Sequence, residues 1–160
     1  MARPFAVVLE EHGEPLATAV LDPSRDELFS AARGEGAHRD RAALRVSDGP
    51  PLREAELSSF LREDKLRGTP PAASFGRLAE AAAILRMGGA GSLELSWVAA
   101  GHIDAWAQPN VDPWDWLPGR LLVEEAGGRA AVLEGDPLAW FVAGAPGTFE
   151  ELVALVSSLR

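Results

Sequence analysis

The chain has 160 residues, of which 47% are hydrophobic and 24% charged, and its formal net charge is −9. This size and composition predict one globular domain over residues 1–160 and exclude disorder, collagen-like repeats and coiled coil. The negative charge, with scattered basic residues, argues against nucleic acid and membrane surfaces as partners. The chain contains no cysteine, which excludes disulfides and thiolate metal sites. No apolar run reaches the roughly 18 residues of a membrane helix and no signal peptide is recognisable, so we expect a cytoplasmic protein.

The first 48 residues predict a β-meander. Short apolar runs alternate with turn sequences such as HGEP, DPSRD and GEGA. The expected strands are PFAVVLE at 4–10, LATAVL at 16–21, ELFSAAR at 27–33 and a stretch ending in ALRVSD at residue 48.

Helical periodicity replaces the strand pattern after residue 51. It predicts a helix over 54–64, an interruption at Thr69-Pro70-Pro71, and a second helix over 75–86. A glycine-rich break at 87–91 precedes a third helix over 92–100, which either is capped by Ser92 or starts slightly earlier.

The rest of the chain alternates strands and helices. Strands are expected over 102–107, 129–133 and 139–143, and helices over 113–126 and 148–159. Thr148 is the expected cap of the last helix. The alternation predicts a layered α/β protein of residues 52–160 following the meander, with a mixed sheet rather than a purely parallel one.

Common catalytic motifs are absent from the sequence. His12, His38 and His102 are far apart and show no HExxH spacing, so we expect solvated or capping roles for them. The serines form no GxSxG motif, and GGAGS lacks the lysine of a P-loop.

Two segments could still bind a ligand. The loop at 88–92 precedes a helix and either presents free backbone N–H groups to an anion or hydroxyls, or is a tight connection. Asp115, in VDPWDWLPG, lies in the first turn of a predicted helix. It is either a helix-cap acid beside two core tryptophans, Trp114 and Trp116, or a ligand for a hard cation. One carboxylate alone does not define a magnesium site.

Four ordered motifs in the C-terminal part decide between these interpretations. They are VAAG at 98–101, DAW at 104–106, PWD at 113–115 and EAGG at 125–128. In this order and spacing they resemble the C-terminal signature of the inositol monophosphatase family. The stretch at 13–48 and the terminal FVAGAP are also similar to that family, and the match is weakest over 51–74.

The resemblance implies a fold, a reaction and site residues. The fold is the layered α/β sandwich of inositol monophosphatase and fructose bisphosphatase, incomplete at its N-terminus. The reaction is Mg²⁺-dependent hydrolysis of a small phosphate monoester of inositol or a related polyol or sugar, commonly by a homodimer. Asp115 would bind metal and lie near a substrate hydroxyl, while Gly89, Ala90 and Gly91 would contact the polyol. Gln108 replaces a polyol-binding glutamate of many members.

The family's remaining metal motifs have no counterpart in this sequence. Members carry a helix with Glu-Glu and a strand and turn reading DP(I/L)DGT ahead of the strand that matches PFAVVL. Glu10 and Glu11 follow that strand at a hairpin turn and cannot replace them. We therefore expect a phosphatase that requires the missing N-terminal segment. The alternative is a non-catalytic scaffold that acts as a binding or assembly module.

Overall fold

A computed structural model describes residues 4–61, 70–135 and 138–159. The first sheet contains β1 (Phe5–Glu11), β2 (Glu14–Asp22), β3 (Glu27–Ala32), β4 (Gly36–Arg39) and β5 (Ala42–Ala43). The second contains β6 (Glu56–Ser58), β7 (Ile84–Arg86), β8 (Ala105–Pro109), β9 (Arg129–Leu133) and β10 (Trp140–Gly144). The helices are α1 (Pro70–Ala81), α2 (Gly91–Ala99), α3 (Pro113–Glu125) and α4 (Pro146–Ser157), and a short 3₁₀ turn spans Leu52–Glu54.

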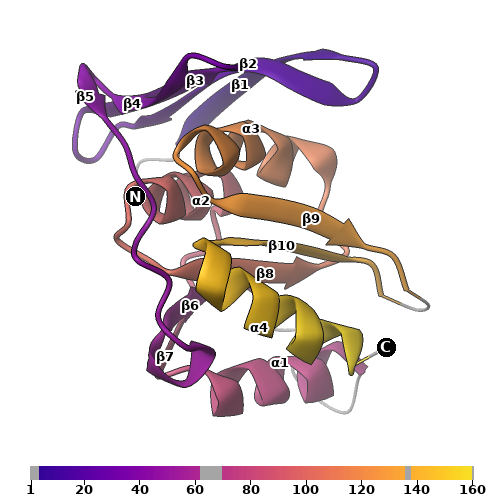
Figure 1. Ribbon diagram of the computed structural model, residues 1–160. Coiled ribbons are helices and arrows are strands. Elements are labelled where there is room, and N and C mark those ends of the chain that lie inside the picture. The colour runs from indigo at the N-terminus through magenta and orange to yellow at the C-terminus, as the bar shows by residue number, and fades with distance from the viewer. Residues whose placement is uncertain (1–3, 62–69, 136–137, 160) are drawn as a thin grey trace.

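These elements form alternating layers. Figure 1 shows the first sheet at the top, α2 and α3 beneath it, the second sheet below these helices, and α4 and α1 on the far side of the second sheet. The helices α2 and α3 therefore form a layer that both sheets share. In the view of Figure 1 no helix lies above the first sheet.

The first sheet is an antiparallel meander in the order β1-β2-β3-β4-β5. Alternate residues of its strands face the shared helices, and Val20 and Phe29 are fully buried there. The strands expected over 4–10, 16–21 and 27–33 are confirmed as β1, β2 and β3, because local runs and turns determine hairpins over short distances. The stretch expected to end at residue 48 forms only β4 and β5, and residues 44–48 are not a strand. Val46 of this segment instead packs in the main core and donates its N–H to the carbonyl oxygen of Ala126 at 3.1 Å.

The second sheet has the order β7-β6-β8-β10-β9. Strand β6 pairs in parallel with β7 and β8, whereas β10 pairs antiparallel with β8 and β9. The expected mixed sheet is thus observed. Its lower face packs on α1 and α4 through Leu57, Leu78, Trp140 and Leu152.

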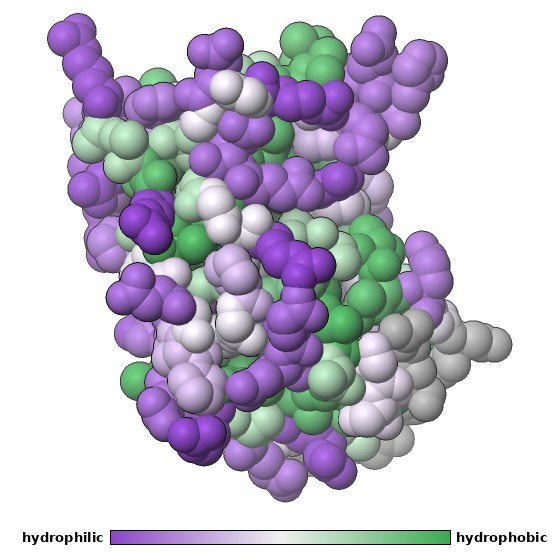
Figure 2. All heavy atoms as spheres, viewed as in Figure 1, coloured by the Kyte–Doolittle hydropathy of each residue, from purple (hydrophilic) through white to green (hydrophobic). Residues whose placement is uncertain are grey.

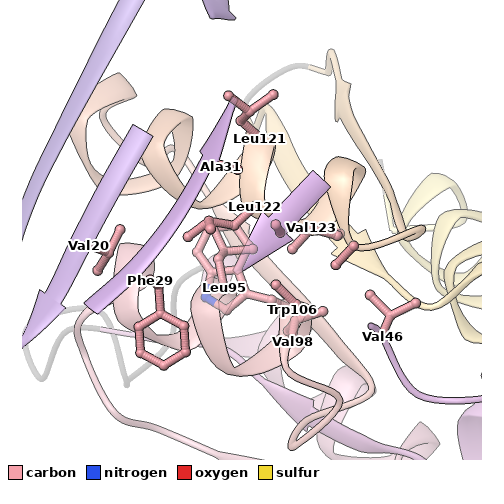
Figure 3. Packing of buried hydrophobic residues seen from close by; sticks show 14 of the residues in the cluster. Val20, Phe29, Ala31, Val46, Leu95, Val98, Trp106, Leu121, Leu122 and Val123 are labelled. Carbon is pink, nitrogen blue, oxygen red and sulfur yellow. The ribbon is translucent and has the colours of Figure 1, made fainter. Parts of the chain in front are cut away.

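The main core fills the space between the two sheets. Figure 3 shows Val20 and Phe29 of the first sheet beside Leu95 of α2, Leu122 of α3 and Trp106 of β8. Close approach of the two helices requires Gly119, because a Cβ on it would lie 2.3 Å from the Cβ of Leu95. The shared layer is therefore tightly packed.

The helix expected over 54–64 is wrong for its described part. Residues Glu56–Ser58 form strand β6 instead, and residues 62–64 lie outside the described part of the chain. Leu57, Ser58 and Ser59 are fully buried, so pairing with β7 and β8 overrides the local helical pattern. Similarly, the helix expected over 75–86 is observed as α1, which starts at Pro70 and ends at Ala81. The last three residues of the expected range, 84–86, form β7 instead.

Of the two alternatives for the helix at 92–100, the earlier start is confirmed, since α2 begins at Gly91, and the expected Thr148 cap of the last helix is wrong. The N-cap of α2 is Ala90 and that of α4 is Ala145, and neither makes a side-chain cap hydrogen bond. Ser92 instead lies inside α2 and donates to the carbonyl oxygen of Asp115 at 3.0 Å. Thr148 lies inside α4 and donates to the carbonyl oxygen of Pro50 at 2.6 Å. Both hydroxyls thus serve tertiary contacts.

The strand expected over 102–107 is observed slightly later in the chain, as β8 at Ala105–Pro109.

Among the described residues, no helix is long and apolar enough to cross a membrane.

Candidate functional site

A cavity of about 410 Å³ lies where the glycine loop, the end of β8 and the start of α3 meet. Its lining residues come from four segments of the chain: Phe60, Leu61, Gly89, Gly91, Gln108, Pro109, Asn110, Val111, Asp112, Asp115 and Leu138. The volume is within the range of small-molecule sites. Four of the residues predicted from the sequence, Gly89, Gly91, Gln108 and Asp115, therefore lie around one cavity.

The glycine loop brings the start of α2 against the start of α3. Gly89 has φ +76, a conformation that favours glycine. A Cβ on Gly91 would lie 2.8 Å from the carbonyl oxygen of Asp115. Ala90, the fifth predicted residue, does not line the cavity and packs against the main core. The loop thus presents its backbone to the cavity at Gly89 and Gly91.

The side chain of Glu94 in α2 holds this loop in place through hydrogen bonds. Its Oε1 accepts hydrogen bonds from the backbone N–H groups of Gly88 at 2.6 Å and Gly89 at 3.2 Å. Its Oε2 accepts one from the indole N–H of Trp106 at 3.2 Å. Burial raises the pKa of Glu94, and these hydrogen bonds partly oppose that rise. The carboxylate thereby connects the loop to α2 and β8.

Two carboxylates stand at the start of α3. Asp112 is the N-cap residue but makes no side-chain cap hydrogen bond, and Asp115 lies in the first turn. Burial raises the pKa of Asp115, and the negative charge of Asp112 raises it further. A cation bound between the two side chains would favour the charged form of both. The tryptophans beside Asp115 differ from the expected pair of core residues, because Trp114 is 68% exposed. Trp116 packs on Phe141 with ring centroids 4.5 Å apart.

The end of β8 and the turn that follows it supply polar groups to the cavity lining. Gln108 pairs with Phe141 in the β8–β10 register and lines the cavity. The next turn contains Asn110 with φ 48, whose side-chain oxygen accepts a hydrogen bond from the N–H of Ala139 at 3.0 Å. An amide such as Gln108 can both donate to and accept from a hydroxyl group.

The described residues do not provide a complete site for several magnesium ions. No group of three or more histidine, cysteine, aspartate or glutamate side chains suited to a metal occurs in the described ranges. Asp112 and Asp115 are the carboxylates that line the cavity there. Mg²⁺ held by one or two carboxylates keeps several waters and depends on substrate phosphate for further oxygen ligands. This donor set therefore fits part of a metal site.

Other residues of the four motifs hold the layers together. Asp104 accepts hydrogen bonds from the Ser47 hydroxyl at 2.6 Å and the Glu56 N–H at 2.8 Å. Glu125 accepts from the N–H groups of Gly34 and Gly36, both at 2.9 Å, and so joins α3 to a turn of the first sheet. These motif acids are structural in the described chain.

Comparison with known proteins agrees with this geometry. The model of the inositol monophosphatase family matches residues 6–157. The chain belongs to the inositol monophosphatase family. It is 36% identical over 144 residues to an inositol-1-monophosphatase of Rhizobium meliloti, a match covering 82% of this chain and 50% of the relative. It is 34% identical over 131 residues to Nus factor SuhB of Xylella fastidiosa, covering 81% of this chain and 48% of the relative.

A solved structure confirms the fold expected for the family. An inositol monophosphatase from Anabaena (Nostoc) sp. PCC 7120 superposes with a TM-score of 0.86 at 29% identity, over 97% of this chain and 64% of the other. The layered α/β sandwich is thus confirmed. The chain spans about half the length of the curated inositol monophosphatase relatives it matches.

The sequence did not single out three polar or charged residues of this region. Asp112 lines the cavity and raises the pKa of Asp115, and its position three residues earlier in VDPWDW was the available signal. Asn110 and Glu94 gave no signal, because their places follow from the β8–β10 pairing and from burial behind the loop.

Proposed function

We propose that this chain forms the polyol-facing part of a Mg²⁺-dependent phosphatase that hydrolyses a small phosphate monoester, of inositol or a related polyol or sugar. The observation that carries the proposal is the convergence of Gly89, Gly91, Gln108 and Asp115 on one cavity of about 410 Å³. The family match over residues 6–157 and a relative named inositol-1-monophosphatase support the same reaction class.

The chemistry of the cavity walls agrees with such a substrate. The first turns of α2 and α3 both meet the cavity, and helix N-termini favour negative charge. The amide of Gln108 can bind hydroxyl groups, and Asp115 can accept a hydrogen bond from a hydroxyl or bind a cation. Bound Mg²⁺ would supply charge neutralisation and an activated water. We propose that the other carboxylates of the metal site come from polypeptide outside these 160 residues.

A chimera tests whether this chain can perform that role. Residues 1–160 replace the matched half of the Rhizobium meliloti inositol-1-monophosphatase, which retains its own remaining half. We expect Mg²⁺-dependent phosphate release from inositol 1-phosphate. In the chimera, Asp115→Asn lowers kcat/KM by about 100-fold or more, the loss typical of removing a charge-stabilising contact.

The matched control is Asp48→Asn, which makes the same change at an exposed residue that does not line the cavity. It leaves kcat/KM unchanged. A folded chimera without turnover, or equal turnover of the Asp115→Asn chimera, contradicts the proposal.

The second candidate function is a non-catalytic binding or assembly module. It is favoured by the incomplete metal-ligand set of the described residues and by relatives named Nus factor SuhB. A folded chimera that releases no phosphate supports this candidate.

A further inference from the structure

Glu94 of α2 carries a carboxylate into the interior of the protein. Hydrophilic residues cover much of the face shown in Figure 2, whereas Glu94 is only 1% exposed. A buried carboxylate is costly unless it is paired or hydrogen-bonded. Arg86 lines a small cavity of about 240 Å³ together with Glu94, but its guanidinium donates to Glu56. The hydrogen-bond donors to Glu94 belong instead to segments that form the candidate site.

One oxygen of Glu94 decides how the glycine loop faces the cavity. Oε1 accepts the N–H groups of Gly88 and Gly89, so the N–H of the cavity-lining Gly89 points to Glu94 and not to a ligand. Adjacent backbone N–H groups at a helix start form a place for an anion, and here a carboxylate of the chain itself occupies it. A Cβ on Gly88 would lie 2.3 Å from Oε1, so this close approach requires glycine.

The other oxygen of Glu94 connects the loop to β8. Oε2 accepts the indole N–H of Trp106 at 3.2 Å. The same indole supports the start of α2, because a Cβ on Gly91 would lie 3.4 Å from Cζ2 of Trp106. Gln108 follows two residues later on β8, and alternate residues of a strand point to the same face. The separation between Gln108 and the glycine loop is therefore set through Glu94 and Trp106.

We propose that Glu94 is a positioning residue, which holds the glycine loop and Gln108 at the separation that binds the hydroxyl-bearing part of the substrate. Glu94 does not line the cavity, so it acts through Gly89 and Trp106 without touching the ligand. Binding groups need such support, because a displacement of about 1 Å lowers catalytic efficiency by large factors. The identity of the ligand rests on the proposed function, whereas the contacts of Glu94 are those of this chain.

Two variants of the chimera with the Rhizobium meliloti enzyme test the positioning role. Glu94→Gln turns an NH₂ group toward N–H donors, and Gly88→Ala displaces the carboxylate while its charge stays. Each is expected to raise KM for inositol 1-phosphate by about 10-fold or more and to change kcat by less than about threefold. Partial unfolding would instead lower the apparent kcat at unchanged KM, because fewer molecules are active.

Matched controls make the same two changes in α1. Glu80→Gln alters an exposed carboxylate, and Gly76→Ala adds a Cβ that would meet no atom within 4 Å. Neither residue lines the cavity, and both variants are expected to leave kcat and KM unchanged.

Nuclear magnetic resonance of the 160-residue chain tests the contacts without catalysis. The backbone N–H signals of Gly88 and Gly89 and the indole N–H signal of Trp106 are expected to shift with pH at one common midpoint, because all three groups donate to one carboxylate. Burial raises the pKa of Glu94, so this midpoint lies above 4.5. In Glu94→Gln the three signals lose this common shift.

The two measurements separate this inference from the proposed function. An active chimera in which neither Glu94→Gln nor Gly88→Ala raises KM overturns the positioning role and leaves the proposed function standing. Three N–H signals that shift at different midpoints overturn the positioning role as well. A folded chimera without turnover contradicts the proposed function, and the N–H signals then decide whether Glu94 holds the loop and β8 together.

Discussion

The two sheets of the molecule have different surroundings although both are made of apolar strands. The second sheet lies between α2 and α3 on one side and α1 and α4 on the other, and Trp106 and Trp140 are buried on its opposite faces. Within the described part of the chain, the first sheet packs on α2 and α3, and Phe5, Val7 and Leu9 are exposed on its other face. The comparison shows that two sheets of similar apolar composition can differ in how many of their faces the described residues bury.

The largest expected effect is a difference in the free energy of unfolding between substitutions on the two faces of the first sheet. Phe29 is fully buried on the covered face, and Phe5 is 69% exposed on the other. Phe29→Ala is expected to lower the free energy of unfolding by about 3–5 kcal/mol, because it leaves a cavity in a packed core. Phe5→Ala changes it by less than about 0.5 kcal/mol, as expected for an exposed site. Urea denaturation measures both.

Equal losses for the two phenylalanine variants would show that the outer face is covered in solution by contacts within this chain or between copies. Measurement over a range of protein concentrations separates these cases, because stability of a self-associated protein depends on concentration.

The next largest effect on stability is expected at Glu94, whose carboxylate links α2 to Trp106 of the second sheet. Glu94→Gln replaces an acceptor of three hydrogen bonds by an amide whose NH₂ group faces N–H donors. We expect a loss of about 2 kcal/mol in the free energy of unfolding, the size typical of hydrogen bonds to a charged group. Glu80→Gln, on a side chain that is 77% exposed, is the control and changes stability by less than about 0.5 kcal/mol.

The pH dependence of the same variant has a definite sign. Burial raises the pKa of Glu94 in the folded state above its ordinary value of 4.5, so the folded state holds this proton more tightly than the unfolded state does. The proton-linked part of the contribution of Glu94 to stability is therefore fully present below pH 4.5 and is lost as the pH rises through the folded pKa, while the three hydrogen bonds accepted by its oxygens add a part that does not depend on this linkage. Glu94→Gln lacks this slope. An identical pH profile for wild type and variant would contradict the assignment.

The success of sequence-based prediction also differed between the parts of the molecule. The meander and the helix Pro113–Glu125 were predictable, because alternation, turn residues and a proline at the helix start are local signals. Strand β6 was not, since its conformation depends on partners about 30 and 50 residues away. The hydroxyls of Ser92 and Thr148 fit a capping pattern, yet tertiary acceptors compete for them.

The candidate site likewise contains residues that the sequence predicted and residues that only the structure reveals. Gly89, Gly91, Gln108 and Asp115 were named through resemblance to a family, and the structure places them around one cavity, while their roles stay predictions. Asp112 and Glu94 belong to that region through the meeting of α2, α3 and β8, and such a meeting of distant segments has no signature in a single sequence.

The smallest expected effect tests the helical layer that both sheets share. A Cβ on Gly119 of α3 would lie 2.3 Å from the Cβ of Leu95 on α2, so Gly119→Ala must move the helices apart. Overpacking costs about 1–3 kcal/mol, and the better helix propensity of alanine returns up to about 1 kcal/mol, so we expect a net loss near 1 kcal/mol.

Gly76→Ala in α1 is the matched control, because a Cβ there would meet no atom within 4 Å. That variant is expected to raise the free energy of unfolding by about 0.5–1 kcal/mol, so the same substitution has opposite signs in the two helices. Thermal denaturation of both variants measures the difference, and stabilisation by Gly119→Ala would mean that α2 and α3 are less closely packed than the core between the two sheets requires.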